Sequence, residues 1–132
     1  AFRGEGGTVV TGGTDNHLAL LDVRPFGLTG RQAESALREA GITANRNVIP
    51  YDPNGSWYTS GVRVGTPATT TLGMGADEMR EIASIMYGVL AATEADATSK
   101  ARFQLPDQVR DGARKRVGEL LAAHRLYPEI AL

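Results

Sequence analysis

Residues 59–68 read TSGVRVGTPA and contain a short alternating strand pattern centred on Arg63. In a strand over residues 61–65, Val62 and Val64 share one face, so Arg63 must project from the other face. Gly61 and Gly65 flank Arg63 without side chains, which predicts an unobstructed guanidinium. The planar fork of this group suits a carboxylate, held by two charge-assisted hydrogen bonds. A solvated arginine in an ordinary salt bridge is the alternative.

A second polar cluster, Asn45-Arg46-Asn47, lies upstream of this strand. Side-chain amides donate and accept hydrogen bonds at once, which is the pattern needed to recognise the edge of a heterocycle. Asparagines also gather in turns for backbone reasons alone, so a turn stays open as the alternative. Residues 49–58 contain two prolines and a glycine, and we predict them as loop. This stretch ends with Trp57-Tyr58. The two aromatic rings either stack on such a heterocycle or cap the core.

Two strands and a helix are predicted in the first part of the chain. A glycine-rich segment surrounds a short strand at residues 8–11, and the nearly continuous apolar run at residues 17–23 is typical of a strand covered on both faces. Thr29 followed by Gln32 forms a capping-box pattern, which predicts a helix that ends at Gly41.

Two further helices are predicted in the second part of the chain. Apolar residues recur at helical spacing from about Asp77 to residue 90, and again after Pro106 to residue 121. The polar residues 94–104 between them are predicted to be a link.

The composition indicates a single domain. The chain has 132 residues, of which 42% are hydrophobic, enough for one core but too few for two ordinary domains. A net charge of −1 provides no basic field for nucleic acid. The sequence contains no cysteine, no apolar run near the roughly 20 residues of a membrane helix, and no signal-peptide pattern. We therefore expect a cytoplasmic protein that binds neither nucleic acid nor membrane, and its start at Ala1 without methionine is consistent with a piece of a larger protein.

Catalytic and metal sites of common types are not indicated. Ser60, His17 and Asp15 have the residue types of a catalytic triad, but nothing in their spacing brings them together. His17 and His124 are the only histidines and fall in different predicted elements, which argues against a zinc site. We predict neither a catalytic residue nor a metal ligand within this chain.

Three segments in register resemble serine hydroxymethyltransferases in order and spacing: GGTDNH at residues 12–17, AGITANRN at residues 40–47, and the stretch at residues 59–68. The resemblance runs from about Val9 to Leu90. It implies an α/β fold, with a short, mostly antiparallel sheet and helices packed on one side. This is the small C-terminal domain of the aspartate-aminotransferase-like fold. Residues 1–132 would form this single domain, with residues 94–132 as a helical C-terminal extension.

The resemblance also implies roles for individual residues. Arg63 would bind the α-carboxylate of serine or glycine, and Asn47 would contact the pterin ring of tetrahydrofolate. Arg46 stands where the family usually has lysine and would approach the folate glutamate tail with a changed geometry. The implied reaction of the full enzyme is reversible transfer of the serine hydroxymethyl group to tetrahydrofolate, with pyridoxal phosphate as cofactor.

The cofactor is expected to be bound mainly by an N-terminal large domain of the same enzyme, in a homodimer or homotetramer. Covalent attachment of pyridoxal phosphate needs a lysine in a pocket that lowers its pKa. The only lysines here are Lys100, in the polar link, and Lys115, between two arginines, and neither fits that role. The isolated chain is therefore expected to be inactive.

Two alternative functions stay open. A related pyridoxal-phosphate enzyme with another acceptor, such as an α-methylserine hydroxymethyltransferase or a threonine transaldolase, would keep Arg63 and could lose folate. In a different class, the chain would be a non-catalytic amino-acid-binding domain, which the missing Schiff-base lysine favours.

Overall fold

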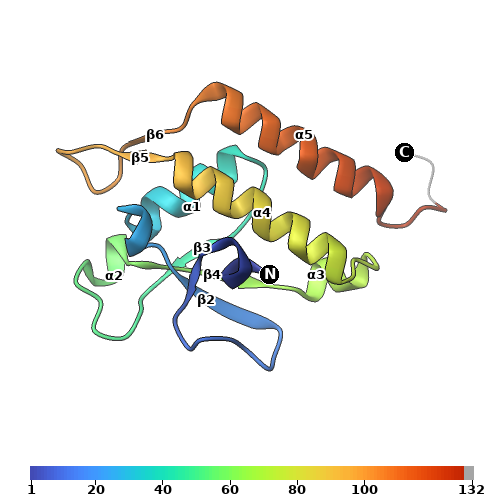
Figure 1. Cartoon of the computed structure of the whole chain (residues 1–132), viewed down its shortest axis with the longest axis horizontal. Helices are drawn as coiled ribbons and strands as arrows, with labels where there is room; N and C mark the ends of the chain where they lie inside the picture. Colours follow the sequence, from blue (N-terminus) through green and yellow to red (C-terminus); the bar gives the residue numbers. More distant parts are fainter. Residues whose placement is uncertain (130–132) are drawn as a thin grey trace.

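The computed structural model describes residues 1–129 and has a four-stranded antiparallel sheet with helices on one side (Figure 1). The strands lie in the order β1-β2-β4-β3. They are β1 (Thr8–Val9), β2 (Leu18–Asp22), β3 (Asn45–Asn47) and β4 (Gly61–Gly65). The long helices are α1 (Gly30–Glu39), α4 (Ala76–Ala92) and α5 (Asp107–Ala123). This arrangement confirms the predicted α/β fold.

Short elements connect the strands and the long helices. They are η1 (Phe2–Glu5), η2 (Arg24–Phe26), α2 (Gly55–Tyr58), α3 (Pro67–Thr71), and a hairpin of β5 (Glu94–Ala95) with β6 (Phe103–Gln104). Residues 49–58 were predicted as loop but contain α2, and the predicted link at residues 94–104 contains the β5–β6 hairpin. Both predictions were wrong because elements this short span too few residues to show a period.

Helix α1 begins with the predicted capping box. The Thr29 hydroxyl oxygen accepts a hydrogen bond from the Gln32 backbone N–H, and Gln32 Oε1 accepts one from the Thr29 N–H at 2.9 Å. The Gln32 amide nitrogen also donates to the carbonyls of Ser99 and Arg102, at 3.1 and 2.7 Å. A local helix cap therefore also holds the β5–β6 hairpin against α1.

The core lies between the sheet and the helices α1 and α4. Leu21 and Val62 from the sheet, Leu37 from α1 and Ile85 from α4 are all almost completely buried. Helix α5 packs on α4, on the side away from the sheet, with Ala113 buried (Figure 1). The predicted extension at residues 94–132 thus includes the β5–β6 hairpin and α5, and its last three residues lie outside the described part of the chain.

Helices cover only one face of β2, so the expectation of a strand covered on both faces was wrong. Ala19 and Leu21 face the core, whereas Leu18 is 37% exposed. Leu18 and Leu20 instead lie over glycines of β4. A Cβ atom at Gly65 would be 3.0 Å from Leu18 Cδ2, and one at Gly61 would be 3.1 Å from Leu20 Cδ1. The apolar run therefore covers the glycines of the neighbouring strand.

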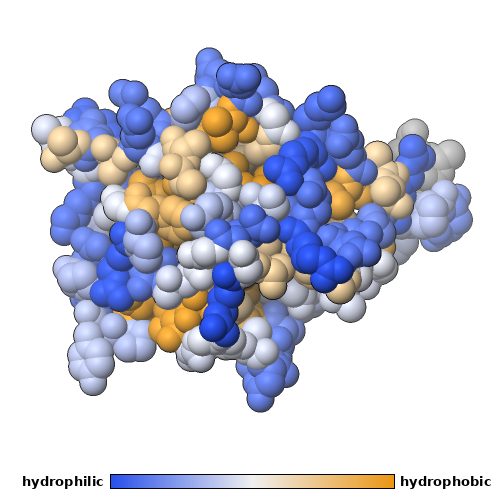
Figure 2. Space-filling model, in the orientation of Figure 1, coloured by the Kyte–Doolittle hydropathy of each residue, from blue (hydrophilic) through white to orange (hydrophobic). Residues whose placement is uncertain are grey.

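The surface is mixed in polarity. Figure 2 shows apolar side chains in separate patches surrounded by hydrophilic ones on the face in view. Within residues 1–129, every helix is too short or too polar to span a bilayer.

Candidate functional site

The antiparallel register places three predicted site residues on the open face of the sheet. Arg63 pairs directly with Asn45, and Gly61 pairs with Asn47. Paired residues point to the same face of a sheet, and residues two apart on a strand do so as well. Arg63, Asn45 and Asn47 therefore share the face opposite the helices. Arg63 is exposed and its neighbour Val62 is buried, which confirms the predicted direction of Arg63.

Neighbouring atoms occupy the space that a side chain at Gly61 or Gly65 would need. A Cβ atom at Gly61 would lie 2.6 Å from Ile49 Cγ2 and 2.8 Å from the Asn47 carbonyl oxygen. The guanidinium is exposed as expected, but the expected reason, open space beside the two glycines, was wrong. Arg63 is accessible because no helix of residues 1–129 covers this face, and the glycines let neighbouring chain segments pack closely beside it.

Arg46 lies on the opposite face of the sheet from Asn47. It pairs with Val62, whose side chain faces the core, and its Nη1 donates to Glu34 Oε2 of α1 at 2.6 Å. The structure thus brings Asn47 together with Arg63 and Asn45 but directs Arg46 towards α1. Adjacent residues of a strand point to opposite faces, so the two predicted folate residues diverge.

Trp57 does not cap the core. Its side chain is 61% exposed, and the guanidinium carbons of Arg31 and Arg46 lie 5.4 and 5.5 Å from its ring centroid. These distances are within the range of cation–π contacts. The core-capping interpretation was wrong for Trp57, because α2 places its ring on the surface beside the N-terminus of α1. Tyr58, the next residue, is half-buried.

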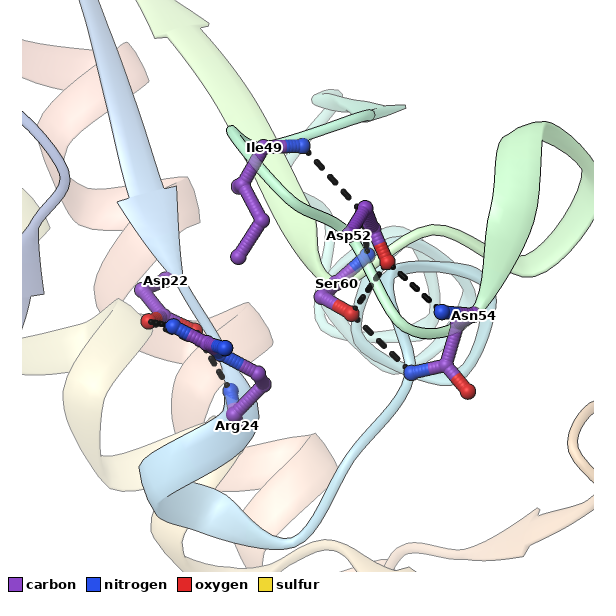
Figure 3. Close-up of polar contacts among 6 residues, drawn as sticks. All are labelled: Asp22, Arg24, Ile49, Asp52, Asn54 and Ser60. Atoms are coloured by element: carbon purple, nitrogen blue, oxygen red, sulfur yellow. Dashed lines mark hydrogen bonds and ion pairs between the residues drawn. The ribbon is translucent and has the colours of Figure 1, made fainter.

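Asp52 joins the loop before β4 to Ser60, the residue directly before that strand (Figure 3). Its carboxylate accepts hydrogen bonds from the backbone N–H groups of Ile49, Asn54 and Ser60, at 3.2, 2.8 and 2.8 Å. The Ser60 hydroxyl donates to the same carboxylate at 2.7 Å and accepts from Asn54 Nδ2 at 3.0 Å. This cluster, the Asp52 clamp, fixes the chain between Asn47 and Arg63.

Hydrogen bonding controls the ionisation of two carboxylates at this end of the sheet. Burial alone would raise the pKa of Asp52, but the hydrogen bonds from Ser60, Asn54 and Ile49 outweigh burial and lower the pKa below its usual value. Burial would likewise raise the pKa of Asp22, and the hydrogen bonds and charge of Arg24 lower it. Arg24 donates from Nε and Nη2 to both Asp22 oxygens (Figure 3). Both carboxylates therefore stabilise the fold in their charged form.

We expect Asp52→Asn to lower the free energy of unfolding by about 2 kcal/mol, because the new NH₂ group would face backbone N–H donors that then lack an acceptor. The folded pKa of Asp52 is depressed, so its contribution is complete above the unfolded pKa of about 3.9 and is lost as the pH falls through the folded value. Urea unfolding at pH 7 and below pH 4 should show the difference from wild type shrinking in acid. Asp111→Asn, an exposed change on α5, is the control; a difference that does not depend on pH would contradict the prediction.

Sequence reasoning missed the Asp52 clamp. The pattern Asp52-Pro53-Asn54-Gly55 is a turn signal, because an aspartate side chain often accepts a bond from the backbone two residues later. Its bonds to Ser60, however, depend on how the loop folds back.

The structure does not bring the residues of the rejected triad together. Ser60 lies next to the end of β2, whereas His17 precedes the start of β2, so these two triad residues lie at opposite ends of this strand pair.

The part of the chain that the structure describes offers no cluster of metal ligands and no sheltered lysine. Within residues 1–129, no three His, Cys, Asp or Glu side chains are grouped to hold a metal ion. Lys100 and Lys115 are both exposed, and Lys100 Nζ lies 5.9 Å from the ring centroid of Tyr58. An exposed lysine does not fit covalent attachment of pyridoxal phosphate.

A cavity of about 360 Å³ lies between α4 and the core face of the sheet. Its lining is mainly apolar and includes Val9, Leu21, Val64, Ile82 and Met86. It includes none of Arg63, Asn45 and Asn47, which lie on the other face. The three predicted site residues on the open sheet face therefore do not contribute to this cavity.

Fold and site together define a small α/β domain with an arginine and two asparagines on the open face of its sheet. The family model for serine hydroxymethyltransferase matches residues 1–86. The chain therefore belongs to the serine hydroxymethyltransferase family.

Individual relatives agree with this assignment. The chain is 57% identical over 124 residues to the serine hydroxymethyltransferase of Mycolicibacterium smegmatis, covering 94% of this chain and 25% of the relative. It is 56% identical over 131 residues to that of Treponema pallidum, covering 96% and 23%. It is 54% identical over 132 residues to that of Salinispora tropica, covering 96% and 28%. The chain thus spans about a quarter of the length of these relatives.

Proposed function

We propose that this chain is the domain of a serine hydroxymethyltransferase that binds the carboxylate of the amino acid substrate. The observation that carries the proposal is the exposed Arg63, held on the open sheet face opposite Asn45. A guanidinium presents parallel N–H groups that match the two oxygens of a carboxylate. In the full-length enzyme, Arg63 would hold serine or glycine in a fixed orientation while its hydroxymethyl group is transferred.

The cofactor belongs, in this proposal, to the rest of the enzyme. Pyridoxal phosphate would be attached by a lysine outside this chain, since Lys100 and Lys115 are exposed. The relatives are about four times longer than the chain, which leaves room for a large cofactor-binding domain. An isolated chain would then be inactive. Residues 94–132 would be a helical extension of the small domain, and the enzyme would be a cytoplasmic homodimer or homotetramer.

Tetrahydrofolate is the proposed one-carbon acceptor, with Asn47 as the contact to its pterin ring. Asn47 is half-buried and lies on the same open face as Arg63. Arg46 is the weaker candidate because its guanidinium is engaged by Glu34 on the other face. Turnover that does not need tetrahydrofolate would instead favour a transaldolase.

We expect the full-length protein to bind glycine at least tenfold more tightly than glycine amide, because the amide lacks the charge and the second oxygen that Arg63 would bind. Isothermal titration with both ligands at pH 7 measures the ratio. Equal dissociation constants would remove the proposed role of Arg63. Glycine binding by a protein without catalytic turnover would favour the non-catalytic amino-acid-binding domain.

A further inference from the structure

The Arg63 side chain makes a specific contact across the sheet. Arg63 Nε donates a hydrogen bond to Asn45 Oδ1 at 3.2 Å, and the two residues are direct partners in the β3–β4 register. Directly paired side chains on an antiparallel sheet are close enough to interact. The contact therefore follows from the backbone register.

The Asn45 amide has one favourable orientation. Its Nδ2 donates to the Arg46 carbonyl oxygen at 3.1 Å, so its oxygen faces Arg63. Turning the amide over would place its NH₂ group against the N–H of the guanidinium and its oxygen against a carbonyl oxygen. Neither pair can form a hydrogen bond. Asn45 is thus held as a fixed acceptor for Arg63 Nε.

This contact leaves the end of the Arg63 fork available. A guanidinium has five N–H groups, and the Nε–H is the one that Asn45 occupies. Within residues 1–129, no carboxylate forms an ion pair with Arg63, and the two terminal nitrogens have no hydrogen-bond partner. Because Asn45 is neutral, it holds the arginine without neutralising its charge.

We infer that Asn45 is a positioning residue for Arg63. Asn45 fixes Arg63 Nε so that both terminal nitrogens of the guanidinium face the substrate carboxylate end-on. The inference rests on the proposed role of Arg63. A free arginine side chain samples many rotamers, and fixing it before the ligand arrives lowers the entropic cost of binding. A carboxylate at position 45 would instead compete with the substrate for the same guanidinium.

The test measures glycine dissociation constants and serine kinetics in the full-length protein. We expect Asn45→Ala to raise the dissociation constant for glycine about tenfold, since one hydrogen bond to a charged group is lost. The KM for serine should rise similarly while kcat stays within about twofold of wild type. Asn45→Asp, which keeps the side-chain shape, should raise the dissociation constant further. Asn16→Ala, which removes another acceptor amide in a turn away from Arg63, is the matched control.

A double-mutant cycle separates this inference from the proposed function. If Asn45 acts through Arg63, Asn45→Ala should have no further effect on glycine binding in an Arg63→Lys background. An unchanged dissociation constant in Arg63→Lys alone would contradict the proposed function. If Arg63→Lys weakens binding but both Asn45 variants bind glycine as wild type does, or if Asn45→Ala lowers kcat as much as it raises KM, the positioning role is wrong and the role of Arg63 stands.

Discussion

Replacing Arg63 with lysine is expected to raise the dissociation constant for glycine in the full-length protein on the order of 100-fold, or about 3 kcal/mol. The lysine ammonium is a compact charge that cannot bind both carboxylate oxygens in the parallel geometry of a guanidinium. Lysine also lacks the Nε–H group of arginine, which donates a hydrogen bond to Asn45 Oδ1. Charge is conserved in this substitution, so the loss reports the geometry of the fork.

Isothermal titration with glycine measures the effect, and circular dichroism checks the fold. Arg80→Lys is the matched control, because Arg80 is an exposed arginine of α4 paired with Asp77 and far from the open sheet face. The control should bind glycine within about twofold of wild type. A change of less than threefold in Arg63→Lys would show that the fork does not hold the carboxylate.

Gly30→Ala is expected to lower the free energy of unfolding by about 3 kcal/mol. Gly30 is the first residue of α1, and its N–H donates to the Thr59 carbonyl oxygen at 3.0 Å. A Cβ atom there would lie 2.0 Å from Thr59 Oγ1 and 2.6 Å from the Gly61 carbonyl oxygen. The Gly61 oxygen is part of β4, so relief of the clash requires the helix to move away from the strand that carries Arg63.

Urea unfolding of the wild type and the variant measures this loss. Gly118→Ala is the matched control, because Gly118 is exposed within α5 and a Cβ atom there meets nothing within 4 Å. The control should gain about 0.5–1 kcal/mol, since alanine favours a helix over glycine. Equal effects of the two substitutions, in sign and size, would mean that α1 and β4 are less tightly packed than the distances at Gly30 indicate.

The sequence by itself determined the features that depend on neighbouring residues. Periodicity and caps located α1, α4 and α5, and the Thr29–Gln32 capping box formed as predicted because both partners lie within one helical turn. The direction of Arg63 followed from strand alternation alone. The three conspicuous segments placed the chain in the serine hydroxymethyltransferase family, and the family model agrees.

Only the tertiary structure decided which distant residues meet. Asn45 contacts Arg63 because of the β3–β4 register, which depends on how residues 48–60 between the two strands fold back. Arg46 faces Glu34 because adjacent strand residues diverge, and the Asp52 clamp closes only when the loop returns to β4. These contacts join groups separated along the chain, and local propensity carries no information about such pairs. The sequence indicated which residues were candidates for the site, whereas tertiary packing determined which side chain each of them contacts.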